Sequence, residues 1–316
     1  MRTKVLLACS IVAAIASVGC KKKGTGGGWL VGADGLMVDV DATGELGDGY
    51  DLGSDDTLFG IACRYQAEAW VVGERGTLLY TADGGESWSR HELGTAADLR
   101  TLATQDAGPV FVAGDGVFFT GVPDRGTGET AWRALGDGST RFRSLAAAQR
   151  ADTVLAVADD GGLWSFESDQ LVKRTTIAGA RAVAVSPDGA QVIVGGAGLS
   201  RSFDGGKTWS VVATDPAHSF ADVRIESSGD AVAVGAGGLV ARIDREGRVL
   251  AQRIGTADLE TLHMKPADAA NYTGLGFAGG ANGQVWLSHD GGWTWAAGPE
   301  VGRAVLGADE VGAGHN

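Results

Sequence analysis

The chain is built from short apolar runs separated by glycine-rich turns. Around the turn Gly73-Glu74-Arg75-Gly76, the run Trp70-Val71-Val72 precedes and the run Thr77-Leu78-Leu79-Tyr80 follows. Apolar runs on both sides of a glycine turn are typical of the two strands of a β-hairpin. No part of the chain beyond residue 20 sustains the period of an amphipathic helix. The pattern predicts an all-β fold.

This apolar–turn–apolar pattern repeats, and successive turns start 37 to 45 residues apart. A repeat of about 40 residues with four short strands is typical of a β-propeller blade. The repeats therefore predict a single seven-bladed β-propeller over residues 29–316. The seven turns start at Gly32, Gly73, Ala113, Ala158, Gly195, Gly235 and Gly280.

A second repeat is a short strand that precedes six of the seven turns, whereas no such strand precedes the first turn. We expect the missing strand to be Gly302-Arg303-Ala304-Val305, near the C-terminus. This C-terminal strand would pair with the N-terminal blade, supply its innermost strand and close the ring. The six other inner strands are predicted to start at Leu58, Leu99, Phe142, Ala180, Phe220 and Leu259.

Three of the predicted hairpins carry an Asp-Gly-Gly turn followed by a tryptophan. Paired glycines permit the positive φ angles of a tight turn, and the aspartate can accept hydrogen bonds from the turn's own backbone. We expect the tryptophan to pack back over its hairpin. The motif resembles the Asp-box, or bacterial neuraminidase repeat, whose copies lie at the outer rim, away from any active site. The three copies are Asp83-Gly84-Gly85-Glu86-Ser87-Trp88, Asp204-Gly205-Gly206-Lys207-Thr208-Trp209 and Asp290-Gly291-Gly292-Trp293-Thr294-Trp295.

The inner strands, glycine turns and Asp-boxes together resemble the propeller family of photosystem II assembly and stability factors and its non-photosynthetic bacterial relatives. The resemblance covers about residues 28–307. It implies a membrane-associated assembly factor that binds a partner protein, helped by an arginine patch. Three blades depart from the arginine pattern, so the particular partner of that family is not carried over. The matching positions are Arg100, Arg143, Arg181 and Arg303, and the departures are Phe59, Ala221 and Glu260.

Two interpretations of these four arginines remain open. In the functional one, they line the mouth of the channel and grip a carboxylate of a protein partner. In the structural one, they bond backbone carbonyls of the next blade or pair with Glu260 or Asp222. Arg100, Arg143, Arg181, Arg303 and Glu260 are therefore the candidate binding residues.

The N-terminus predicts export and lipid attachment. Residues 5–16 form an apolar run after a basic start, which is too short to span a bilayer but fits a signal peptide. The run ends in Ala16-Ser17-Val18-Gly19-Cys20, which resembles a bacterial lipobox. We expect residues 1–19 to be a lipoprotein signal peptide, Cys20 to carry the lipid, and residues 20–28 to form a tether. This places the protein in a bacterial cell envelope, with the outer membrane preferred; an ordinary signal peptide is the alternative.

Charge and cysteine content narrow the class of partner. The formal net charge is −13, which argues against general nucleic-acid binding. Cys9 leaves with the signal peptide and Cys20 carries lipid, so Cys63 has no intrachain disulfide partner. Its apolar neighbours predict a packed thiol. We expect a monomeric propeller.

Sequence features of an enzyme are weak. Sialidases share Asp-boxes and use an arginine triad with a tyrosine nucleophile, but no Arg-Ile-Pro motif precedes the first box here, and Tyr80 lies on a box strand. The five histidines are scattered and no nucleophile elbow is present.

Each Asp-box offers one carboxylate, which makes a calcium site the minor alternative to a structural role. We predict a non-enzymatic binding scaffold without metal or cofactor; the alternative is a carbohydrate-active hydrolase.

Overall fold

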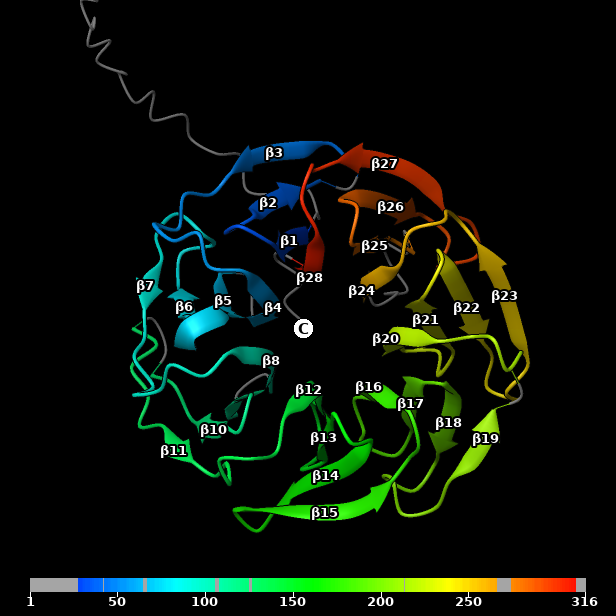
Figure 1. Cartoon of the computed structure of the whole chain (residues 1–316), viewed down its shortest axis with the longest axis horizontal. Helices are drawn as coiled ribbons and strands as arrows, with labels where there is room; N and C mark the ends of the chain where they lie inside the picture. The colour runs from blue at the N-terminus through cyan, green and yellow to red at the C-terminus, as the bar shows by residue number, and fades with distance from the viewer. Residues whose placement is uncertain are drawn as a thin grey trace, which may run out of the picture.

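The computed structural model describes residues 28–41, 43–64, 67–105, 108–124, 127–212, 214–265 and 274–310. The predicted signal peptide, Cys20 and nearly all of the tether lie outside the described residues. The described chain forms seven four-stranded antiparallel sheets arranged as blades around a central axis (Figure 1). This confirms the predicted seven-bladed β-propeller. In the part of the chain that the structure covers, no helix is long and apolar enough to cross a membrane.

Each blade is numbered here from the N-terminus, and its strands are given from the inner to the outer edge. Blade 1 is β28 (Val305–Glu310), β1 (Gly28–Gly32), β2 (Met37–Val40) and β3 (Leu46–Gly49); blade 2 is β4 (Leu58–Arg64), β5 (Glu68–Gly73), β6 (Leu78–Thr81) and β7 (Ser89–Arg90), with the 3-10 turn η1 (Glu74–Gly76); blade 3 is β8 (Leu99–Thr104), β9 (Val110–Gly114), β10 (Phe118–Gly121) and β11 (Arg133–Ala134). Blade 4 is β12 (Phe142–Ala147), β13 (Val154–Ala158), β14 (Gly162–Glu167) and β15 (Gln170–Thr176); blade 5 is β16 (Ala180–Val185), β17 (Val192–Gly196), β18 (Gly198–Ser202) and β19 (Ser210–Val212); blade 6 is β20 (Phe220–Ile225), β21 (Ala231–Gly235), β22 (Leu239–Ile243) and β23 (Val249–Arg253); blade 7 is β24 (Leu259–Met264), β25 (Gly276–Gly280), β26 (Gln284–Ser288) and β27 (Ala296–Glu300).

The core of the protein lies between neighbouring blades. The second strand of a blade, such as β13 or β21, is buried along its whole length because both of its faces are covered. Strands covered on both faces are continuously apolar rather than alternating, which explains the apolar runs in the sequence. Outer strands such as β15 are mostly exposed and carry polar residues.

The C-terminal strand closes the ring, as predicted. Strand β28 pairs antiparallel with β1, so that Val305 lies opposite Gly32 and Glu310 lies opposite Gly28 (Figure 1). Six inner strands begin at the predicted residues. The prediction for the seventh is wrong, because β28 begins at Val305 rather than Gly302. Arg303 therefore lies in the loop before the strand.

Close packing at the glycine turn fixes this register. Gly32 lies opposite Val305 in the same way that Gly114 lies opposite Leu99. A Cβ atom on Gly32 would lie 1.8 Å from the Ala304 carbonyl oxygen, and one on Gly114 would lie 1.9 Å from that of Asp98. Only glycine permits this approach. The pairing makes Val305, rather than Gly302, the equivalent of Leu99.

Every inner strand contains a β-bulge directly after its first residue. A bulge leaves one extra residue without a partner in the hydrogen-bond ladder between the strands, and it changes the direction of that residue's side chain. Leu306, and not Arg303, is the bulge residue of blade 1. In blade order, the seven bulge residues are Leu306, Phe59, Arg100, Arg143, Arg181, Ala221 and Glu260.

The three Asp-Gly-Gly turns connect the third and fourth strands of blades 2, 5 and 7. In blade 5, the Asp204 carboxylate accepts hydrogen bonds from the Thr208 N–H at 2.8 Å, the Thr208 hydroxyl at 2.7 Å and the Ser202 hydroxyl at 2.8 Å. The turn also donates a Gly205 N–H to the Ala190 carbonyl of the loop between the first two strands. The aspartate is thus used within its own turn. Among the described residues, no cluster of three or more His, Cys, Asp or Glu residues could hold a metal ion.

The tryptophans of these turns do more than cover their own hairpins. Trp209 donates its indole N–H to the Gly206 carbonyl of its own turn at 3.0 Å. Its ring, however, packs into the apolar cluster shared with blade 4. Trp88 lies against Trp29 of blade 1, with ring centroids 5.7 Å apart. The motif therefore stabilises the contact with the preceding blade as well as the turn.

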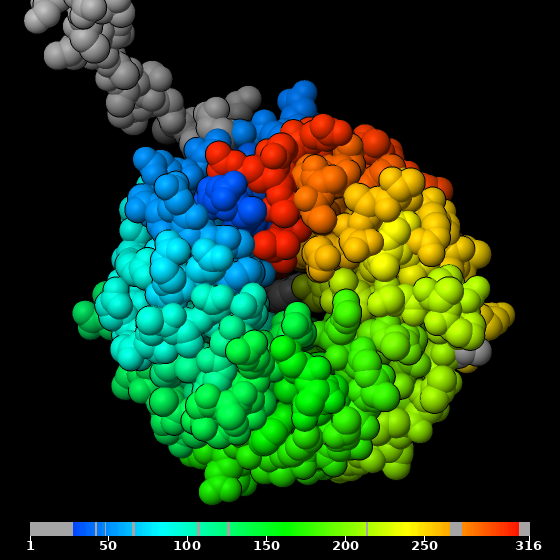
Figure 2. Space-filling model, viewed as in Figure 1, coloured from blue at the N-terminus to red at the C-terminus, as the bar shows by residue number. Residues whose placement is uncertain are grey.

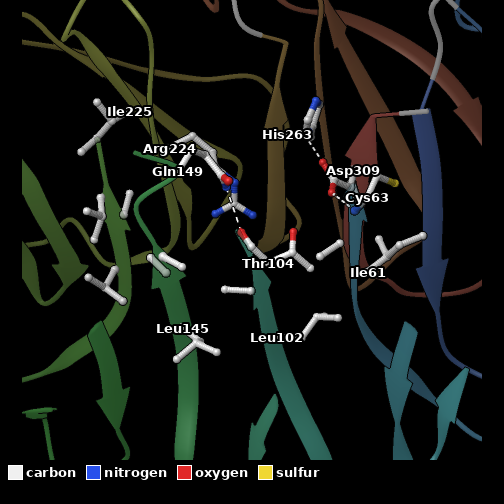
Figure 3. A pocket seen from close by; sticks show the side chains of 18 of the residues that line it. Ile61, Cys63, Leu102, Thr104, Leu145, Gln149, Arg224, Ile225, His263 and Asp309 are labelled. Atoms are coloured by element: carbon white, nitrogen blue, oxygen red, sulfur yellow. Dashed lines mark hydrogen bonds and ion pairs between the residues drawn. The ribbon is translucent and has the colours of Figure 1, made fainter. Parts of the chain in front are cut away.

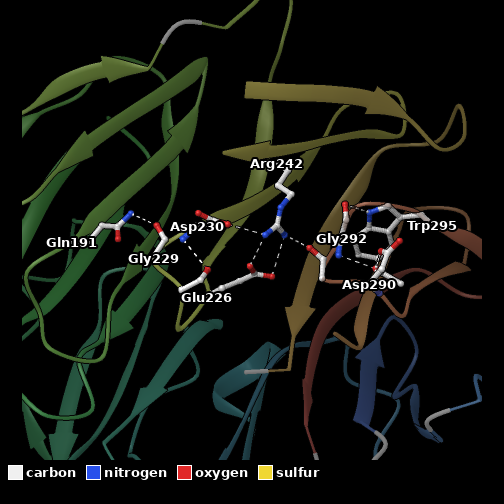
Figure 4. A network of polar contacts seen from close by, with 11 residues as sticks. Gln191, Glu226, Gly229, Asp230, Arg242, Asp290, Gly292 and Trp295 are labelled. Atoms are coloured by element: carbon white, nitrogen blue, oxygen red, sulfur yellow. Dashed lines mark hydrogen bonds and ion pairs between the residues drawn. The ribbon is translucent and has the colours of Figure 1, made fainter. Parts of the chain in front are cut away.

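A buried arginine connects blades 6 and 7 (Figure 4). Arg242 on β22 forms ion pairs with Glu226 at 3.0 Å and Asp230 at 2.9 Å, and it also donates to the Gly291 carbonyl in the turn of blade 7. The Arg242 side chain is only 9% exposed. Such a cation is tolerated in a buried position because two carboxylates and a carbonyl accept from it and the Trp293 ring lies over it, with its centroid 4.7 Å from the guanidinium carbon.

Candidate functional site at the central channel

The seven inner strands line a central channel, and the space-filling view shows the ring hollowed at its centre (Figure 2). We call the end where the inner strands begin the bulge mouth, because the bulge residues lie there. The end where the inner strands finish is the pocket mouth. Because the strands of a blade alternate in direction, the glycine turns lie at the bulge mouth and the Asp-Gly-Gly turns lie on the face of the pocket mouth.

At the bulge mouth, Arg100, Arg143 and Arg181 come from three neighbouring blades, 3, 4 and 5. They occupy the same bulge position, so they form a continuous arc on one side of the mouth. We call these three residues the arginine arc. The equivalent positions of the other blades carry the apolar or acidic residues Leu306, Phe59, Ala221 and Glu260.

Two members of the arginine arc are paired with acids of their own blades. Arg100 donates to Asp115 at 3.1 Å and to Asp98 at 3.0 Å, and the hydrogen bond to Asp115 raises the pKa of Arg100. Arg143 donates to Asp159 at 3.3 Å. The glycine turns supply Asp115 and Asp159. The partners that the structural interpretation named, Glu260 and Asp222, are not the ones used.

Arg181 differs from its two neighbours. The glycine turn of blade 5, Gly195-Gly196-Ala197-Gly198, holds no acid. Within the described residues, neither Arg181 nor Glu260 makes a side-chain hydrogen bond or ion pair, and both are exposed. Arg303 is also exposed, but it donates to the Asp34 carbonyl at 2.8 Å and lies outside the bulge position. Arg181 is thus the member of the arc that is open to a partner.

The pocket mouth holds a cavity of about 310 Å³, lined by the final residues of the inner strands (Figure 3). One equivalent position, the third residue after the bulge, lines it in all seven blades. Blades 2 to 5 place Ala62, Ala103, Ala146 and Ala184 there, whereas blades 6, 7 and 1 place Arg224, His263 and Asp309 there. We call Arg224, His263 and Asp309 the polar arc. The cavity therefore has the polar arc on one side and, across from it, a wall of these four alanines, with Arg64, Thr104 and Gln149 also in the lining.

Asp309 joins three blades at this wall. Its carboxylate lies 3.1 Å from Nδ1 of His263 in blade 7 and accepts the Cys63 N–H of blade 2 at 2.6 Å. A histidine that donates Nδ1–H to a carboxylate has a fixed ring orientation. Cys63 is half-buried and packs against the apolar cluster around Ile61, as the sequence predicts for a packed thiol.

The third member of the polar arc is held by a buried carboxylate. Arg224 donates Nη1 to Asp222 at 2.6 Å and to the Val223 carbonyl at 2.9 Å. Asp222 also accepts the Leu262 N–H of blade 7 at 2.9 Å. Burial raises the pKa of Asp222, against the lowering effect of Arg224 and the backbone N–H groups. The Arg224 side chain remains 39% exposed to the channel.

Sequence reasoning missed the polar arc, although the signal was present. Aligning the inner strands at their bulges shows alanine in four blades and Arg224, His263 and Asp309 in the other three. Because the sequence prediction started this inner strand at Gly302, it placed Leu306, rather than Asp309, at the cavity-lining position of blade 1. Among the described lining residues, Asp309 is the single carboxylate. Glycoside hydrolysis by the usual mechanism needs two, so the cavity does not favour the hydrolase alternative.

The same fold occurs in solved structures of protein-binding propellers. The structure described as YCF48 bound to D1 peptide is 17% identical, with 77% of this chain and 80% of that chain covered and a TM-score of 0.56. YCF48 from Cyanidioschyzon merolae is 15% identical, with 80% and 88% covered and a TM-score of 0.60. Chaetomium thermophilum Sqt1 bound to the N-terminus of the ribosomal protein L10 is 14% identical, with 80% and 77% covered and a TM-score of 0.58.

These similarities define the class of fold. At such low identity they show that the chain shares the propeller architecture, and they assign no activity. No protein-family model and no curated protein sequence matches the chain. Function must therefore be argued from the two mouths of the channel.

Proposed function

We propose that this protein is a non-enzymatic scaffold or assembly factor that docks a protein partner at the bulge mouth. The arginine arc carries the proposal, because three neighbouring blades place an arginine at the same bulge and Arg181 remains open. An exposed guanidinium can hold a carboxylate through two parallel hydrogen bonds. The expected contact on the partner is therefore an acidic side chain or a chain end.

The comparisons support a polypeptide ligand. Two of the similar propellers were solved with a bound polypeptide, the D1 peptide in one and the N-terminus of ribosomal protein L10 in the other. The resemblance to photosystem II assembly factors supports the same interpretation. The identity of the partner is not carried over, because two of the three arc arginines here are already paired.

Cross-linking in cells followed by purification of the protein tests this proposal. We expect Arg181→Ala to reduce the recovery of a co-purifying partner by ~10-fold, because a hydrogen bond to a charged group contributes ~1.5–3 kcal/mol. Arg303→Ala should have a smaller effect, since Arg303 lies outside the arc. Arg248→Ala is the matched control, because its side chain is 78% exposed in a turn on the opposite face. Equal recovery with Arg181→Ala and Arg248→Ala would reject the docking role of the arc.

We further propose that the scaffold is tethered to a bacterial cell envelope through a lipid on Cys20, with the outer membrane preferred. Several acyl chains hold a protein firmly, since each buried CH₂ contributes about 0.8 kcal/mol. Metabolic labelling with palmitate tests this: the native protein should take up label and sediment with membranes, and Cys20→Ala should do neither. Label retained by the variant would exclude Cys20 as the attachment site.

A further inference from the structure

Within the polar arc, Arg224 has hydrogen-bond donors that are open to the cavity. Arg224 uses Nη1 for Asp222 and the Val223 carbonyl, whereas Nε and Nη2 make no hydrogen bond to any residue that the structure describes. Figure 3 shows Arg224 among the residues that line the cavity. The Nε/Nη2 edge of a guanidinium is one of the two edges that bind a carboxylate with two parallel hydrogen bonds.

The other charged groups of the described lining are already engaged. Arg64 donates to Glu68 at 3.1 Å and 3.0 Å and to the Gly108 carbonyl at 3.0 Å. The Asp309 oxygens accept from His263 and Cys63. Asp222, which balances Arg224, is buried and does not line the cavity. The wall therefore presents the open edge of a cation, although the whole chain is strongly acidic.

The alanine wall determines what else the ligand can be. Alanine is the smallest apolar side chain, and four neighbouring blades use it at the position that faces the polar arc. Leu102 and Leu145 lie one residue before these alanines and continue the apolar lining. The cavity volume of about 310 Å³ is at the low end of the range for small-molecule pockets, ~300–1,000 Å³. The cavity size favours a small ligand, and the alanines and leucines favour an apolar body opposite its charged group.

We infer that the polar arc binds a single carboxylate carried on a small apolar group, with the carboxylate on Arg224 and the apolar body against the alanine wall. Two sources share this chemistry, a free short-chain acid and the C-terminal residue of a polypeptide. The inference concerns the pocket mouth and does not depend on the arginine arc, which lies at the opposite end of the channel.

Calorimetric titration of the full-length protein tests the inference with isovalerate, N-acetyl-Ala-Leu and the amide of N-acetyl-Ala-Leu. We expect at least one of the two acids to bind and the amide to bind ~10-fold more weakly or not at all, because the amide lacks the charge that Arg224 recognises. Preference for isovalerate identifies a free acid as the ligand class, and preference for N-acetyl-Ala-Leu identifies a chain end.

Variants assign the binding to the two walls. Arg224→Gln should weaken acid binding by ~10-fold or more. Because that change leaves buried Asp222 without its cation, Ala146→Leu provides a second test that fills the cavity from the opposite wall and leaves the ion pair intact. Arg248→Gln is the matched control and should retain the affinity, because Arg248 is an exposed arginine that does not line the cavity. Absence of binding to both acids, equal binding of acid and amide, or unchanged affinity in Ala146→Leu would overturn the inference.

Discussion

At the scale of single residues, the aspartates of the Asp-Gly-Gly turns have lowered pKa values because groups of their own turns donate hydrogen bonds to them. Hydrogen bonds from the Thr208 N–H and hydroxyl hold the pKa of Asp204 well below its usual range. In Asp83, burial alone would raise the pKa, but bonds from Ser87 and Thr81 lower it overall. The carboxylates therefore act as ionised acceptors that hold the turn, which is a structural role.

This effect predicts an acid sensitivity. A carboxyl whose pKa is lower in the folded state binds protons more readily when unfolded, so its contribution to stability is present above pH ~4 and is lost as the pH falls toward the folded-state value. We expect Asp204→Asn to lower the melting temperature at pH 7 and to reduce the loss of stability between pH 5 and pH 3. Thermal unfolding across this range measures both. Asp55→Asn, at an exposed residue without a hydrogen bond among the described residues, should change neither.

A second residue-scale prediction concerns the buried cation between blades 6 and 7. Arg242→Met leaves Glu226 and Asp230 without their cation, and removing one partner of a buried pair costs ~3–5 kcal/mol. Denaturant unfolding should show this loss. Arg248→Met is the control, because the exposed pair with Asp244 contributes ~0–1 kcal/mol. A loss for Arg242→Met no larger than that of the control would contradict the account.

At the scale of elements, the bulge at the start of each inner strand is the repeated device that positions function. It places one residue of every blade at the bulge mouth and, three residues later, another in the cavity. Blades 3 to 5 use the first position for the arginine arc, and blades 6, 7 and 1 use the second for the polar arc. One backbone design thus supports two different surfaces at opposite ends of the channel.

The register of these strands depends on the glycine that lies opposite the first strand residue. We expect Gly114→Ala to destabilise the protein by ~1–3 kcal/mol, because the new Cβ would overlap the Asp98 carbonyl oxygen. Gly49→Ala on the outer strand β3 is the matched control, since the nearest atom would be 3.7 Å away. Chemical unfolding of both variants compares them, and equal stability would mean that close approach does not fix the register.

The sequence predicted elements better than it predicted the site. Glycine turns and apolar runs predicted the number of blades, six inner-strand starts and the closing strand, since these follow from local patterns. The predicted start of β28 was wrong by three residues, because the sequence around Arg303 resembles the sequence around Arg100. The actual register depends on the contact between Gly32 and Ala304, which are far apart in the sequence. The polar arc depends on that same register, so it was missed as well.

At the scale of the whole molecule, the ring has two functional ends with different chemistry. The bulge mouth is an exposed rim where Arg100 and Arg143 pair with acids and Arg181 is open, and it suits a polypeptide. The pocket mouth is a small cavity with an alanine wall, and it suits a compact ligand. Closure by β28 serves both ends, because this strand carries Leu306 at one and Asp309 at the other.

Site-specific photo-cross-linking tests the central claim, that a protein partner docks at the bulge mouth. A photoreactive amino acid in place of Arg143, next to Arg181 in the arc, should yield a cross-linked partner in cells. The same amino acid in place of Leu250, which is exposed on the outer strand β23, should yield none. Adducts at position 250 and none at position 143 would contradict the account.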